Sequence, residues 1–84
     1  MIPFVLDGGG SGELILLDGE RCQLISTRPA APGTPLCATL EGESESLELK
    51  VNRCSRRPDD RFDIDARLVN LTRTLRTSLA ARLG

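Results

Sequence analysis

Histidine, tryptophan and tyrosine are absent from this chain of 84 residues, and Phe4 and Phe62 are its only aromatic residues. Without histidine there is no Ser-His triad, no imidazole base and almost none of the usual zinc catalysis. The paired acids Asp59–Asp60 and Glu43–Glu45 lie in stretches typical of exposed turns. A carboxyl group needs burial or a close like charge to become a catalytic acid. We therefore expect no enzyme activity.

The scarcity of aromatic residues also bears on nucleic-acid binding. A protein that binds single strands combines a basic groove with aromatic rings that stack on the bases. Here both phenylalanines lie in apolar stretches that we expect to be buried, and Asp59 and Asp60 would oppose phosphates near the neighbouring arginines. We expect no nucleic-acid partner.

Cysteine spacing and the shortness of the apolar runs exclude further classes. Cys22, Cys37 and Cys54 are odd in number and form no Cys-x-x-Cys pair, which argues against a disulfide framework or a zinc knuckle. Each lies in a strand-like stretch, where a free cysteine serves as a small buried apolar residue. The apolar run 2–6 is too short for a signal peptide, and no stretch reaches the length of a membrane span. We expect a cytoplasmic protein with no cofactor, metal or membrane span.

Charge is divided unevenly along the chain, although the net charge is only −1. Residues 1–49 hold eight acids and two arginines, a net −6, whereas residues 50–84 hold nine bases and four acids, a net +5. Such asymmetry can mark an anion-binding face. We favour the interpretation that acidic and basic strands lie side by side in one fold.

Hydrophobic periodicity predicts short strands followed by one helix. The apolar run 2–6 and a glycine-rich turn at 7–12 precede stretches that favour strands, often with alternating apolar and polar residues. We expect these strands at residues 13–17, 21–27, 36–42, 47–52 and 61–68. From Leu68 the leucines recur every three or four residues, which predicts an amphipathic helix over 69–83, capped by Asn70 or Thr72. The fold class is mainly β, a small antiparallel barrel or sandwich with one C-terminal helix.

The stretch RCSRRPDDR at residues 53–61 is the strongest cluster of charge. Arg53, Arg56 and Arg57 are candidate ligand-binding residues. Arg-x-x-x-Arg spacing occurs twice, between Arg53 and Arg57 and between Arg57 and Arg61. The alternative is a solvated hairpin tip with local ion pairs, which we favour. Asp63 and Asp65 would then lie on the outer face of the next strand and pair with Arg61 or Arg67.

Three stretches in order resemble the PilZ domain family: PAAPGTPL at 29–36, LELKVNR at 47–53 and FDIDARLVNLTRTLRTSLAARL at 62–83. The resemblance extends over residues 13–83. It implies a six-stranded barrel with a C-terminal helix, in a single domain of residues 1–84 with barrel strands over 13–68. Many members of that family are bacterial receptors for cyclic di-GMP.

The ligand motifs of the family do not match here. The resemblance places its Asp/Asn-x-Ser-x-x-Gly motif on residues 16–21, where Leu16, Asp18 and Arg21 replace the acid or amide, the serine and the glycine. An aspartate adds negative charge beside an anionic ligand, and the arginine side chain blocks close approach to the backbone. The family's Arg-x-x-x-Arg before the barrel is also missing, because residues 1–12 contain no arginine.

Three hypotheses follow from these patterns. The first is a degenerate PilZ-like module that contacts another signalling or motility protein through edge strands, the acidic hairpin 41–46, or Arg73 and Arg76 on the helix. The second is a receptor that binds cyclic di-GMP or another phosphorylated ligand through the arginine-rich segment. The third is an assembly element that forms a homodimer.

Overall fold

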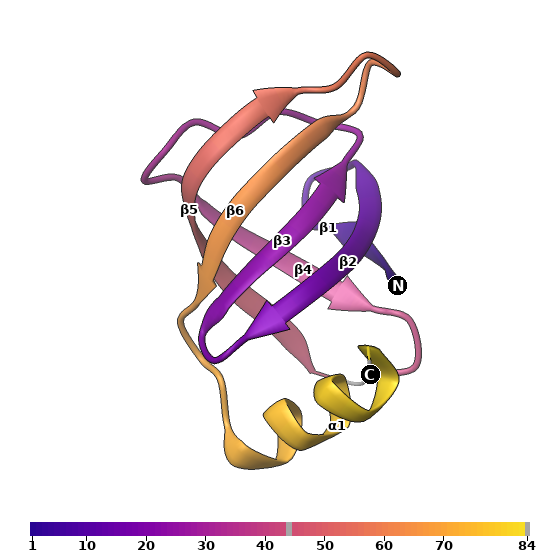
Figure 1. The fold of residues 1–84 in the computed structure, drawn as a ribbon, viewed down its shortest axis with the longest axis vertical. Helices are drawn as coiled ribbons and strands as arrows, with labels where there is room; N and C mark the ends of the chain where they lie inside the picture. The colour runs from indigo at the N-terminus through magenta and orange to yellow at the C-terminus, as the bar shows by residue number, and fades with distance from the viewer. Residues whose placement is uncertain (44, 84) are drawn as a thin grey trace.

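Six antiparallel strands close into a barrel in the computed structural model of the chain, and one helix lies across one end of it (Figure 1). This architecture confirms the predicted fold class. The structure describes residues 1–43 and 45–83. The elements are β1 (Ile2–Leu6), β2 (Ser11–Asp18), β3 (Arg21–Ser26), β4 (Pro35–Leu40), β5 (Ser46–Arg56), β6 (Phe62–Leu68) and α1 (Arg73–Leu83).

The order of strands around the barrel is β1-β2-β3-β6-β5-β4, and β4 pairs with β1 to close the ring. The proline-rich stretch 27–34 connects β3 to β4, which are not neighbours. Each of the six described strands pairs on both sides over part of its length, but β4 accompanies β5 only over residues 46–50, so residues 52–56 of β5 have a strand partner on one side only. The prediction of partner contacts through edge strands stays a prediction.

Alternation along the strands builds the core. In β5 the side chains of Leu47, Leu49 and Val51 point inward and are each 1% exposed, while Glu48 and Lys50 between them face solvent. The other strands contribute Ile, Leu, Ala, Phe and Cys side chains to the same cluster. Apolar burial of this kind contributes roughly 25 cal/mol per Å² of surface removed from water. A core without tryptophan or tyrosine is thus filled by aliphatic side chains.

Two β-bulges interrupt this alternation at the same level of the barrel. In β2 the register with β3 shifts between Leu14 and Leu16, so that Ile15 is the extra residue. In β5 the register with β6 shifts between Val51 and Arg53, so that Asn52 is extra. A bulge redirects the side chains that follow it. Asn52 and Arg53 consequently both face solvent.

The C-terminal helix begins at Arg73, later than the predicted start at residue 69. Thr72 is the N-cap, since its Oγ1 accepts a hydrogen bond of 3.1 Å from the Leu75 backbone N–H. Leu75 and Leu79 are buried against the barrel end, as the leucine spacing predicts. No helix in the described part of the chain is long and apolar enough to cross a membrane.

Side-chain contacts fix both ends of the helix to the barrel. Asn70, just before the helix, accepts a 3.0 Å hydrogen bond from the Glu48 backbone N–H and donates one of 3.1 Å to the Ser46 carbonyl. Arg82 in the last turn contacts Glu43 at 3.3 Å and the Glu41 carbonyl at 2.6 Å. Part of the acidic hairpin 41–46 is therefore occupied by the helix.

Candidate interaction surface

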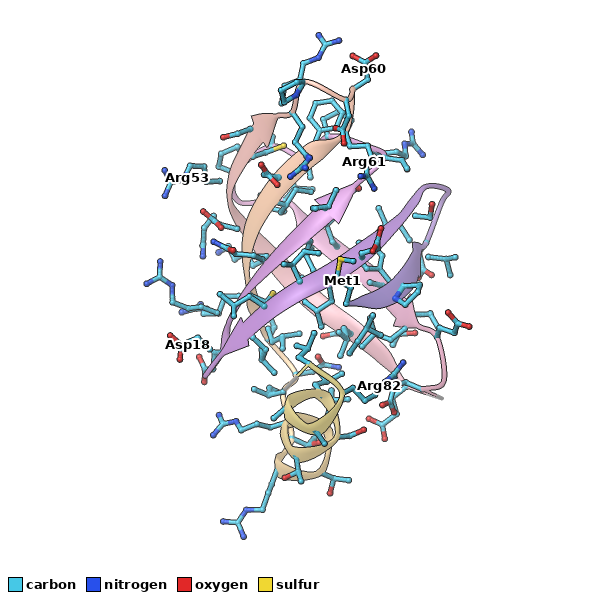
Figure 2. All side chains as sticks on the ribbon, turned by 45° about the vertical axis from the view of Figure 1, so that its right-hand side comes forward. Met1, Asp18, Arg53, Asp60, Arg61 and Arg82 are labelled. Carbon is cyan, nitrogen blue, oxygen red and sulfur yellow. The ribbon has the colours of Figure 1, made fainter. Side chains whose placement is uncertain are left out.

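The arginine-rich segment 53–61 belongs partly to a strand. Arg53 and Arg56 lie in β5, not in a loop as the sequence predicts, because β5 extends to residue 56. The turn itself is closed by a 2.7 Å hydrogen bond from the Arg57 backbone N–H to the Arg61 carbonyl. Figure 2 shows Asp60 and Arg61 at the far end of the barrel from the helix. The arginines of the segment are therefore divided between β5 and the turn that follows it.

Carboxylates hold the arginines that flank the turn. Arg57 Nη1 lies 2.8 Å from Asp63 Oδ1, and its Nε lies 3.4 Å from Asp59 Oδ1. Arg61 Nη2 lies 3.1 Å from Asp59 Oδ2, and its Nη1 lies 3.5 Å from Glu13 Oε1. The positive charge of both guanidinium groups is therefore balanced within the protein.

The two strand arginines also face carboxylates. Arg53 Nε lies 3.4 Å from Asp65 Oδ2, and Arg56 Nη2 lies 2.8 Å from Asp60 Oδ1. Their side chains are 75% and 73% exposed, so each ion pair is worth only about 0–1 kcal/mol. The prediction of a hairpin tip with local ion pairs is confirmed. The predicted partners of Asp63 and Asp65 are wrong, since these acids pair with Arg57 and Arg53 rather than with Arg61 or Arg67.

Hydrogen bonds in the turn change two protonation equilibria. The Arg61 backbone N–H donates to Asp59 Oδ1 over 3.1 Å, and this bond lowers the pKa of the Asp59 carboxyl below its ordinary value of 3.8. The hydrogen bond to Asp63 raises the pKa of the Arg57 guanidinium. Both effects favour the charged forms, so the turn keeps its ion pairs at neutral pH.

The three positions of the unmatched motif lie together on the outer face of the barrel. Asp18 is the cross-strand partner of Arg21, and Leu16 is that of Gln23. Leu16, Asp18 and Arg21 line one shallow pocket of about 270 Å³, and Arg53 from β5 lines it as well. Figure 2 shows Asp18 and Arg53 on the same side of the barrel, both pointing outward.

A second pocket of about 400 Å³ adjoins the first and shares Gln23, Arg53 and Asp65 with it. Arg57 lines this second pocket, while Arg56 lines neither. The structure thus brings Arg53 together with the motif positions and with Arg57. It separates them from Arg56, whose side chain extends into solvent beside Asp60.

The structure also reveals a row of three cations on the outer face, which the sequence alone did not predict. Arg21 on β3 is the cross-strand partner of Arg67 on β6, and Arg67 is the partner of Lys50 on β5. All three residues are exposed. We refer to Arg21, Arg67 and Lys50 as the basic row. Correct strand order and register would have revealed it, but the sequence separates its members by 46 and 17 positions.

The helix arginines Arg73 and Arg76 lie on the exposed side of α1, as predicted. In residues 1–43 and 45–83 neither of them forms an ion pair. Arg73 is the first helical residue, where the positive end of the helix dipole gives a cation no stabilisation. They remain candidates for contact with a partner.

The cysteines do not share one environment. Cys22 is buried and points its Sγ toward the Ala66 carbonyl at 3.5 Å, and burial raises the pKa of its thiol to about 12. Cys54 is half-buried, and Cys37 is exposed. The prediction of three buried cysteines is therefore wrong for Cys37, which faces outward from β4. Within the described residues, no cluster of three or more acidic or cysteine side chains could hold a metal ion.

Comparison of the chain with protein-family models, curated proteins and solved structures found no match in any of the three.

Proposed function

We propose that this chain is a non-enzymatic binding module, PilZ-like in architecture, that acts through contact with another protein. The setting we propose is bacterial signalling of the cyclic di-GMP type, which controls motility, surface attachment or exopolysaccharide. In this proposal the nucleotide site is degenerate, and the barrel serves as a scaffold for a surface of charged side chains.

The observation that carries the proposal is the charge balance of the arginine-rich segment. Each of its four arginines lies within ion-pair distance of an acid of the same protein, and these acids would repel an incoming phosphate. At the motif positions, Asp18 adds a further negative charge, and Arg21 puts a long side chain where the family's motif has glycine. A dianionic nucleotide would have to displace these ion pairs before it could bind the arginines of the segment.

The exposure of two arginines supports a second candidate function. The side chains of Arg53 and Arg56 are 75% and 73% exposed, so a phosphorylated ligand could exchange for their carboxylate partners at small cost. Such a receptor would bind cyclic di-GMP or a related ligand in a non-standard way, with Arg57 as the third contact.

Calorimetric titration of cyclic di-GMP at low and at moderate salt separates the two functions. We expect no saturable heat of binding. Sub-micromolar binding that is lost in the double variant Arg56→Ala/Arg57→Ala, and kept in the matched helix variant Arg73→Ala/Arg76→Ala, would establish the receptor and refute our proposal. Sedimentation equilibrium of the same sample tests the assembly hypothesis, since a homodimer would have twice the monomer mass.

A further inference from the structure

The basic row places like charges directly opposite one another on three adjacent strands. Arg21 and Arg67 face each other across the β3–β6 pair, and Arg67 and Lys50 face each other across the β6–β5 pair. Directly opposed residues have Cβ atoms about 4.5–5.5 Å apart, and like charges at that separation destabilise a sheet. The fold alone gives no reason for such a row.

The two acidic side chains that precede Arg67 on the same face of β6 are engaged elsewhere. Asp65, one step along β6 from Arg67 on the same face, pairs with Arg53. Asp63, one step further, pairs with Arg57. In the part of the chain that the structure describes, no member of the basic row forms an ion pair. Its three positive charges are therefore available to an anion from outside.

The bulges give the surface beside the row its shape. Asn52, the extra residue of β5, lines the 270 Å³ pocket together with Arg21 and Arg53. Leu16, which follows the bulge in β2, lines the opposite side of that pocket and is 50% exposed. An apolar side chain is thus presented beside a line of cations. The combination suits a ligand that is anionic and also carries an apolar group.

The dimensions favour a short ligand over a polymer. Three strands at about 4.8 Å spacing spread the basic row over roughly 10 Å. Acids border it, with Asp18 opposite Arg21 on β2 and Glu48 two residues before Lys50 on the same face of β5. A nucleic acid would extend past these borders and meet like charge. Its bases would also find no aromatic ring, since Phe4 is buried and Phe62 is half-buried in the barrel.

We propose that the basic row, with Leu16 and Asn52 beside it, is the docking surface for a short acidic segment of a partner protein. Two or three carboxylates of that segment pair with Arg21, Arg67 and Lys50, and an apolar side chain packs on Leu16. This inference rests on the proposed function, because it names the surface through which the module makes its protein contact. In this proposal recognition occurs through side chains.

Fluorescence anisotropy with a labelled peptide tests the inference. The probe is fluorescein-labelled Asp-Glu-Leu-Asp-Glu, with Lys-Lys-Leu-Lys-Lys as the control peptide. The test variant is Arg21→Glu/Arg67→Glu. The control variant is Arg73→Glu/Arg76→Glu, which makes the same charge change on the helix, the other candidate contact surface, so that the pair of variants decides between the two surfaces. We expect the test variant to weaken binding about tenfold or more and the control variant to change it less than about twofold. Raising the salt concentration should weaken wild-type binding.

A second variant separates a loss of binding from a loss of the fold in the test variant. Far-UV circular dichroism reports whether Arg21→Glu/Arg67→Glu retains the barrel. If it does not, Arg21→Gln/Arg67→Gln removes the charges without adding acids, and its expected loss is about threefold or more. Equal loss in the helix variant, or no binding of the acidic peptide to the wild type, would overturn the inference.

Other results would assign the surface differently. Tighter binding of an oligothymidylate than of the acidic peptide would replace the protein segment with a nucleic acid. Self-association of the wild type, abolished by Arg21→Glu/Arg67→Glu, would make a second copy the occupant. Failure of the inference is distinguishable from failure of the proposed function, because the function is refuted only by saturable binding of cyclic di-GMP in calorimetry.

Discussion

Replacing Gly12 with alanine should destabilise the barrel, although alanine is ordinarily the better residue within a strand by roughly 0.5–1 kcal/mol. Gly12 lies in β2, where Phe4 on β1 and Ser26 on β3 are its cross-strand partners. A Cβ at this position would lie far inside contact distance of the Ile25 carbonyl oxygen and 2.7 Å from Cζ of Phe4. The obstacle is backbone on one side and a buried ring on the other.

The free-energy cost of Gly12→Ala depends on which groups the new Cβ would displace. A flexible side chain could rotate away, but the Ile25 carbonyl belongs to β3, and β3 also pairs with β6. Displacing it stretches two strand pairs, and the ring of Phe4, which is 3% exposed, has no free space to enter. Overpacking of this kind costs about 1–3 kcal/mol and occasionally more. We expect a loss of about 3 kcal/mol, which lowers the Tm by about 12–24 °C in a domain of this size.

Urea unfolding followed by far-UV circular dichroism measures this loss, since the chain has no tryptophan or tyrosine to report by fluorescence. The matched control is Gly8→Ala. Gly8 has a φ of 82°, but nothing lies within 4 Å of the position that a Cβ would take, so its substitution costs only the left-handed conformation, about 1–2 kcal/mol. Our reasoning is refuted if Gly12→Ala costs less than Gly8→Ala, or if it stabilises the protein.

Three other predictions use single residues. Thr72→Ala should lower the free energy of unfolding by about 1 kcal/mol through loss of the helix cap, and Thr72→Ser should restore it in the same urea assay. At about pH 8, Cys37 should react quickly with a thiol reagent, whereas Cys22 should react only after unfolding, because burial raises its thiol pKa to about 12 and leaves little thiolate. The pKa of Asp59 is lowered in the folded state, so its stabilising contribution is present above its ordinary pKa of 3.8 and is lost as the pH falls through the folded value. Asp59→Asn should therefore flatten the acid side of the stability profile, and an unchanged profile would contradict the role of the bond from Arg61.

Periodicity predicted the elements whose signal is local. Alternating residues placed Leu47, Leu49 and Val51 in the core, and the leucine spacing placed Leu75 and Leu79 against the barrel. These predictions hold because each depends only on which face of a strand or helix a residue occupies. The glycine-rich stretch was a harder case, since Gly12 has the local signature of a turn. It lies in a strand because it pairs with Phe4 on β1 and Ser26 on β3, and the close approach of these strands leaves no room for a Cβ.

Details of the candidate site depended on register, which the sequence does not display. In a regular strand with Val51 inward and Asn52 outward, Arg53 would point into the core. The bulge at Asn52 turns Arg53 outward and sets it opposite Asp65, so the predicted ion-pair partners were wrong. The basic row was missed for a related reason, because its members become neighbours only when β3, β6 and β5 pair in this order.

Closure of the ring makes the shortest strand indispensable. β1 has five residues, and it alone separates β2 from β4. A proteolytic cut after Leu6 would leave two unsatisfied strand backbones, each able to recruit a strand from another molecule. Two intact chains could also exchange their β1 strands, so that each β1 pairs with β2 and β4 of the other chain. The result would be a domain-swapped dimer held together by the same strand pairs as the monomer.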